Sequence, residues 1–119
     1  MPGITRAQAF QWLAWMNVTL GGAVYRHVQN TSDQIPEDLR NAKVAALGKA
    51  EVHKLLGILE QHLIGKTWMV GDTFTLVDAH LVGAIVWINH LGFDTKSLTS
   101  IDAWTARCKA RPAFARTMA

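Results

Sequence analysis

The stretch from Trp68 to Leu91 most constrains the fold, because it joins a helix-start signal to a long apolar run. Thr75 and Asp78 have the spacing of an acidic capping box. In this motif the hydroxyl accepts from a backbone N–H of the first turn, and the carboxylate accepts from the N–H of Thr75. The carboxylate also lies where the helix dipole favours negative charge. We therefore interpret Thr75 and Asp78 as a structural N-cap, not as a catalytic pair.

The run from Leu76 to Leu91 is apolar on nearly every side, which is typical of a buried central helix. It is shorter than the roughly 20 apolar residues that a membrane span needs, and it contains an Asp, an Asn and two His. These polar residues exclude a transmembrane segment. The sequence therefore predicts an internal helix around which the other helices pack.

The chain has 119 residues, half of them apolar, and five Trp. A chain of this length forms one domain, 1–119, with a substantial core. Pro is scarce, no run alternates in the manner of a strand, and the repeated signal is helical periodicity. The predicted fold class is all-α, an up-and-down bundle of about five helices.

The first predicted helix begins near Thr5 as N-cap, has a kink or break at Gly21-Gly22, and continues to Val28. Pro36 and two acidic residues restart a second helix, which Gly65 ends as a C-terminal cap. This second helix carries a one-sided apolar stripe with helical spacing, made of Val52, Leu55, Leu56, Leu59 and Leu63. We assign Lys49, Lys54, Glu60 and Gln61 to its wet side.

Thr99 and Asp102 repeat the capping-box spacing before the next helix, and Pro112 stops that helix. A last short turn is predicted from Ala113 to Met118. The two long helices before the central one form an antiparallel hairpin. Neither part of the chain can bury its apolar stripe without the other.

Charge and composition exclude several classes of function. The net charge is +3 and the pI about 9.4, but the basic residues are mostly scattered and no aromatic platform accompanies them, so no nucleic-acid partner is predicted. The single Cys gives no disulfide, and the five His show no pair with metal-ligand spacing, so no metal is predicted. Neither a signal peptide nor a membrane segment is predicted, and the predicted location is cytoplasmic. No nucleophile–base pair or phosphate-binding loop is found, so no catalytic residue is assigned.

The first helix carries the remaining candidates. Tyr25 has a hydroxyl that can donate to a thiolate, and Arg26 can bind a carboxylate through two N–H groups. Trp12, Trp15 and Met16 can line an apolar cleft for a small hydrophobic ligand. The alternative is that Tyr25 and Arg26 are merely solvated, and that the aromatic stripe is core or a partner surface.

The order of several motifs resembles that of the C-terminal helical domain of the cytosolic glutathione transferases. These motifs are the segment from Trp68 to Ala79, then Trp87, then Trp104 and Arg107 leading into the sequence ARPA at 110–113. The resemblance extends from Arg6 to Phe114, and order and spacing together carry it. The first helix is most similar to bacterial beta-like members. Several of these have a His-Lys pair where this sequence has Gly21-Gly22.

The resemblance implies a helical domain that supplies the hydrophobic co-substrate wall and part of a dimer or domain interface. On this basis Trp12, Trp15, Met16, Tyr25 and Arg26 are the candidate wall residues. The thioredoxin-fold domain, which carries the thiol-activating residue in that family, is missing from this sequence. No cofactor is expected, and glutathione would be a co-substrate only once that domain is supplied, so we expect no transferase activity from the chain alone.

The expected partners are a thioredoxin-fold domain or a second copy of the chain, and a small hydrophobic ligand, with no membrane. Two alternatives without catalysis stay open. One is a free-standing interaction module, similar to the transferase-like domains fused to translation factors and aminoacyl-tRNA synthetases. The other is a carrier of small hydrophobic ligands. Exposure of the first helix and of the Trp87 helix would favour a partner or a dimer.

Overall fold

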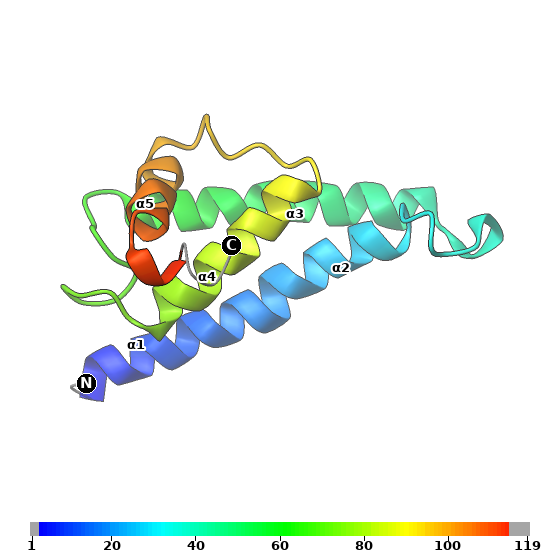
Figure 1. The fold of residues 1–119 in the computed structure, drawn as a ribbon. Helices are drawn as coiled ribbons and strands as arrows, with labels where there is room; N and C mark the ends of the chain where they lie inside the picture. The colour runs from blue at the N-terminus through cyan, green and yellow to red at the C-terminus, as the bar shows by residue number, and fades with distance from the viewer. Residues whose placement is uncertain (1–2, 115–119) are drawn as a thin grey trace.

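A computed structural model describes residues 3–114 of the chain. Within these residues the regular structure is entirely helical, and the predicted all-α bundle is confirmed. Figure 1 shows one long N-terminal helix lying beside a second long helix, with a shorter helix crossing between them. None of the described helices is both long and apolar enough to cross a bilayer.

The N-terminal helix consists of α1 (Gly3–Ala14), the π-helical segment η1 (Trp15–Leu20) and α2 (Gly21–Gln29). The helix already includes Gly3, so the prediction that Thr5 is its N-cap is wrong. The sequence predicted a kink or break at the glycine pair, and the break is wrong, since Gly21 has helical angles, φ −58° and ψ −41°. Tertiary packing overrides the weak helix propensity of glycine there, and the irregularity lies one turn earlier, in η1.

The polar connection contains only a single 3-10 turn, η2 (Glu37–Leu39), where the sequence predicted the start of the next helix. The helix proper, α3 (Ala42–Leu63), begins later because Asn41 caps it. The Asn41 side-chain oxygen accepts from Lys43 N at 3.0 Å and Val44 N at 3.2 Å. Such a cap satisfies N–H groups that have no partner within the helix.

The apolar stripe of α3 is buried as predicted, and Gly65 follows the helix with φ +73°, the left-handed conformation that glycine adopts readily. Helix α2 packs closely along α3. At Gly48 a Cβ atom would lie 2.9 Å from His27 N and 3.0 Å from Ala23 O. Because these are backbone atoms, only glycine permits this approach of α2 to α3.

The central helix α4 (Leu76–His90) has both halves of the capping box. Its inner side is buried in the core, through Val77, Leu81, Val82, Ile85 and Ile88. The prediction that it is buried all round is wrong, because Leu76 is 62% exposed and Trp87 45% exposed. These two residues lie eleven positions apart, which places them on one face of the helix. That face has no cover within the described residues.

Helix α5 (Thr99–Lys109) completes the core with Ile101 and Trp104. The predicted Thr99–Asp102 capping box is absent, since Thr99 is already helical and no side chain of the helix caps it. Instead the Glu60 carboxylate of α3 accepts from Ser100 N and Ile101 N, each at 2.9 Å. Glu60 is therefore not a wet-side residue of α3, as the sequence suggested, but the cap of a neighbouring helix.

Burial alone would raise the pKa of the Glu60 carboxyl, but the hydrogen bonds from Ile101 and Ser100 outweigh it and lower that pKa below its ordinary value. Residues 112–114 are helical after α5, and the rest of the predicted turn from Ala113 to Met118 lies outside the described residues. The largest buried side chains come from every long helix, and include Leu20, Leu56, Leu59, Leu81, Ile85, Ile101 and Trp104.

Candidate functional site

Asp78 joins three parts of the chain at the start of α4. Its side chain is fully buried, and Oδ2 accepts from Thr75 N at 2.9 Å. Oδ1 accepts from Met69 N at 2.9 Å and from Trp104 Nε1 at 2.8 Å. The Thr75 hydroxyl in turn accepts from Val77 N at 3.3 Å. One carboxylate therefore fixes the loop before α4, the first turn of α4, and α5.

The sequence pattern identified Thr75 and Asp78 but not Met69 or Trp104 as partners. A buried Trp needs an acceptor for its indole N–H, and this is the one sequence signal that could have suggested Trp104. A carboxylate with three N–H donors and no exposed surface positions its surroundings. Substrate has no access to it, so its chemistry in this site is that of a structural anchor.

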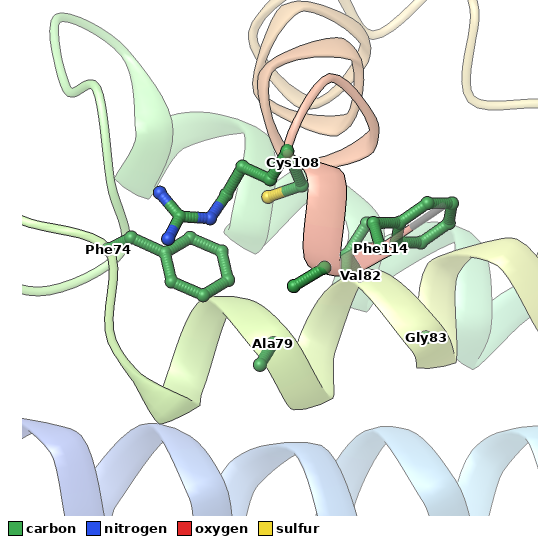
Figure 2. A pocket seen from close by; sticks show the side chains of 8 residues that line it. Phe74, Ala79, Val82, Gly83, Cys108 and Phe114 are labelled. Carbon is green, nitrogen blue, oxygen red and sulfur yellow. The ribbon is translucent and has the colours of Figure 1, made fainter. Parts of the chain in front are cut away.

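An apolar pocket lies directly beside this anchor, between α4, α5 and the turn that follows α5. It has a volume of about 240 Å³ and is lined by Phe74, Ala79, Val82, Gly83, Cys108, Arg111, Ala113 and Phe114. Figure 2 shows Phe74 and Phe114 on opposite sides, with Ala79 and Gly83 on α4 and the Cys108 sulfur facing the pocket. The Arg111 guanidinium carbon lies 3.8 Å from the centroid of the Phe74 ring. A cation over an aromatic face is a favourable arrangement.

Cys108 is not a nucleophile in this pocket. Burial raises the pKa of its thiol to about 12; the negative charge of Asp78 adds to the effect, and Arg107 and Arg111 oppose it. The thiolate is the reactive form of cysteine, and a thiol with this pKa stays protonated at neutral pH. The pocket can therefore accept an apolar group but cannot activate one.

The five predicted wall residues differ in exposure and in their contacts. Trp12 and Trp15 form an edge-to-face pair with ring centroids 5.2 Å apart, and both are half-buried. Met16 lies in the core, and Tyr25 is exposed further along the helix. Arg26 forms an ion pair with Glu51 at 2.7 Å. None of the five lines the apolar pocket.

Trp12 also packs on His62 of α3, with ring centroids 4.3 Å apart. His62 Nε2 lies 2.7 Å from Met69 O and donates to it, because a carbonyl only accepts. Burial lowers the pKa of the imidazole below its ordinary value. The hydrogen bond to Met69 acts to raise this pKa, and the charge of Lys66 lowers it further. The sequence missed this residue; a His on the flank of an apolar stripe gives no distinctive signal.

A second apolar feature lies between α1 and α4, and we call it the α1/α4 groove. It is lined by Arg6, Ala9, Phe10, Leu13, Thr75, Leu76 and Val77. Phe10 is 59% exposed, and the Arg6 guanidinium carbon lies 5.7 Å from its ring centroid. The groove continues the exposed face of α4 that carries Leu76 and Trp87. Large exposed apolar side chains gathered in one place indicate an interaction surface.

Within residues 3–114 no three His, Cys, Asp or Glu side chains are grouped so that they could hold a metal ion. Three polar side chains are buried within these residues: Asp78 forms the anchor, Thr95 accepts from Asn89 Nδ2 at 3.0 Å, and the Thr105 hydroxyl has no hydrogen-bond partner there.

Comparison with known proteins gives consistent matches. The family model for the glutathione S-transferase C-terminal domain matches residues 15–112. The chain is similar to glutathione S-transferase GST-4.5 of Xanthomonas campestris, with 26% identity over 106 residues, which cover 89% of this chain and 52% of that protein. The chain thus spans about half the length of this relative.

Solved structures show the same fold. A glutathione S-transferase from Xanthobacter autotrophicus superposes with a TM-score of 0.78 at 22% identity, covering 94% of this chain and 54% of that one. Ure2p in complex with S-hexylglutathione superposes with a TM-score of 0.87 at 18% identity, covering 99% and 57%. At these identities the likeness establishes the fold alone.

Proposed function

The chain belongs to the glutathione S-transferase C-terminal domain family, and from this premise we propose that it is the helical half of a two-part transferase site. In this proposal it supplies the hydrophobic co-substrate wall and a docking surface for a thioredoxin-fold domain. Glutathione and the group that activates its thiol come from the other part. The reaction is conjugation of glutathione to a hydrophobic electrophile by thiolate attack.

The observation that carries the proposal is the uncovered apolar face formed by the α1/α4 groove and the outer side of α4. Phe10, Leu76 and Trp87 are all between 45% and 62% exposed on the two helices that meet there. Burying this surface against a partner would remove apolar area from water at about 25 cal/mol per Å². Arg6 at the rim adds a charged group that can set the orientation of the partner.

The proposed co-substrate wall keeps the five residues of the first helix. Trp12 and Trp15 present an aromatic edge and face, and Tyr25 adds an exposed hydroxyl along the same helix. Met16 supports the aromatic pair from the core, and Arg26 is held by Glu51. Thr75 and Asp78 act in this proposal as the fold-critical cap that holds α4 in place behind the groove.

The test supplies a transferase thioredoxin-fold domain as a separate chain. The 119-residue chain alone should not conjugate glutathione to 1-chloro-2,4-dinitrobenzene above background, because in this proposal the group that activates the thiol belongs to the thioredoxin-fold domain. The two chains together should form a complex, measured by titration calorimetry, and conjugation should appear with it. Turnover by the 119-residue chain alone would contradict the division of roles.

A matched pair of variants locates the docking surface. Leu76→Lys places a charge in the α1/α4 groove and should weaken the complex at least about tenfold, the equivalent of 1.4 kcal/mol. Leu39→Lys alters an equally exposed leucine in η2, away from the groove, and should leave the affinity unchanged. Equal affinities for both variants, or no complex with the unaltered chain, would refute the proposed surface.

A further inference from the structure

The apolar pocket between α4, α5 and the turn after α5 has no role in the proposed transferase site. None of the residues that line it belongs to the α1/α4 groove. Its volume of about 240 Å³ exceeds the roughly 150 Å³ in which an engineered apolar cavity holds one benzene molecule. It is smaller than the roughly 300–1,000 Å³ of pockets that hold drug-sized ligands. The pocket therefore has room for a single ring with a short substituent.

The walls of the pocket suit a flat aromatic ring. Phe74 and Phe114 lie on opposite sides, and Ala79 and Gly83 line the pocket from α4 (Figure 2). A Cβ atom at Gly83 would meet nothing within 4 Å, so the space beside α4 is open at this position. A ring placed between the two phenylalanines can contact both of them edge to face or offset, which are the geometries that aromatic pairs favour.

Arg111 is the only charged side chain that lines the pocket within the described residues. Its guanidinium carbon lies over the Phe74 ring, 3.8 Å from the centroid, so the position of the charge is fixed relative to one wall. A guanidinium packs on an aromatic ring through its flat face, which leaves the N–H groups at its edge available. Within residues 3–114 no hydrogen bond or ion pair occupies these N–H groups. A carboxylate can accept from two of them side by side.

The other charged groups near the pocket already have partners. Besides burial, the groups that shift the pKa of the Cys108 thiol are Asp78, Arg107 and Arg111, one negative and two positive. The Asp78 carboxylate is fully buried and accepts from three N–H groups. Arg107 donates to two backbone carbonyls of the connection before α4. Because the thiol stays protonated at neutral pH, it adds no negative charge, and Arg111 is left to bind an anionic group.

We propose that the apolar pocket binds a small aromatic carboxylate, of the size of benzoate or phenylacetate. The ring lies between Phe74 and Phe114, and the carboxylate accepts from the N–H groups of Arg111. A neutral aromatic compound leaves the guanidinium without a partner, and a short aliphatic acid leaves the apolar walls uncovered. The pocket therefore selects a ligand that has both a ring and a negative charge.

The experiment titrates the ¹⁵N-labelled 119-residue chain with benzoate and with phenylacetate, and follows the amide signals of Ala79 and Gly83 by NMR. At least one of the two acids should give saturable shifts with a Kd below about 10 mM. Three comparison compounds separate the parts of the ligand: benzyl alcohol lacks the charge, acetate lacks the ring, and cyclohexanecarboxylate has a ring that is not aromatic. Each should bind at least about threefold more weakly than the better acid.

Two pairs of variants test the assignment. Gly83→Leu extends a side chain from the face of α4 that lines the pocket, so it should raise the Kd at least about tenfold without lowering the melting temperature. Gly57→Leu is its control, because a Cβ there also meets nothing within 4 Å and Gly57 lies on α3, outside the pocket. Arg111→Gln should raise the Kd about tenfold or more, whereas Lys109→Gln removes the same charge outside the pocket and should leave it unchanged.

The absence of saturable shifts with both acids would overturn the proposal. Equal binding of any comparison compound would overturn it as well, as would equal affinities for the two members of either pair of variants. All of these measurements use the 119-residue chain without a thioredoxin-fold domain, so their outcome is independent of the proposed transferase role.

Discussion

Replacing Asp78 by alanine should cost far more than the loss of a helix cap. The cap itself is worth about 1 kcal/mol. In addition, Met69 N and Trp104 Nε1 lose their acceptor in a fully buried site, and each unsatisfied donor costs about 1–3 kcal/mol. Partial relaxation around the smaller side chain reduces the sum, so we expect Asp78→Ala to lower the free energy of unfolding by about 3–5 kcal/mol.

Asp78→Asn keeps the shape of the side chain but removes its charge and replaces one acceptor oxygen by a donor. The amide keeps one acceptor oxygen for Met69 and Trp104, but its NH₂ group then faces the N–H of Thr75, donor against donor. We expect a smaller loss than in Asp78→Ala, about 1–3 kcal/mol. Urea denaturation followed by tryptophan fluorescence measures both variants. Asp38→Asn, on the exposed turn η2, is the control and should change stability by less than about 0.5 kcal/mol.

A double-mutant cycle tests the indole bond directly. Trp104→Phe removes the donor, so it should cost less in the Asp78→Ala background than in the original chain, by about 1 kcal/mol or more. Additive effects of the two substitutions would refute the inference that this hydrogen bond holds α5 to α4. A loss below about 1 kcal/mol for Asp78→Ala would refute the anchor as a whole.

The remaining predictions concern helix packing, capping and reactivity. Gly48→Ala should lower the free energy of unfolding by about 1–3 kcal/mol, because the new Cβ would meet the backbone of α2. Gly57→Ala in the same helix meets nothing within 4 Å and should raise the free energy of unfolding by about 0.5–1 kcal/mol. Urea denaturation measures both variants. Glu60→Gln should lower the free energy of unfolding near pH 7. Because the pKa of Glu60 in the folded chain lies below its ordinary 4.5, the difference in stability from the original chain should fade as the pH drops through that folded pKa. A stability difference that does not change with pH would contradict the cap. Cys108 should resist alkylation by iodoacetamide at pH 8 in the folded chain and should react in urea, and mass spectrometry measures the extent of labelling. Rapid labelling of the folded protein would contradict a thiol pKa of about 12.

The fold was predictable where one local signal had no competitor. The Thr75-x-x-Asp78 spacing, the leucine stripe of α3 and the stop at Gly65 each depend on residues within a few positions of one another. Predictions failed where a distant residue supplied the decisive interaction. Glu60 caps α5 from forty positions away, so local spacing at Thr99 could not reveal the true start of that helix.

The sequence predicted less of the candidate site than of the fold. Helical spacing placed Trp12, Trp15 and Met16 near one another, but it could not tell which side of the helix α3 and α4 would cover. The apolar character of α4 likewise predicted burial, and the exposed face at Leu76 and Trp87 becomes visible only when the surrounding helices are placed. Periodicity gives a residue its face of the helix, and tertiary packing decides what that face contacts.

The wide turn η1 has a consequence for how this chain tolerates insertions and deletions. A π turn holds about one residue more than an α turn, and one residue corresponds to about 100° of rotation around the helix axis. Deleting one residue between Trp15 and Leu20 would therefore remove the extra residue and give an unbroken α-helix in which α1 keeps its orientation relative to α2. Ala9 would stay in the core and Phe10 in the α1/α4 groove, whereas a deletion within α2 would turn both away from these positions by about 100°.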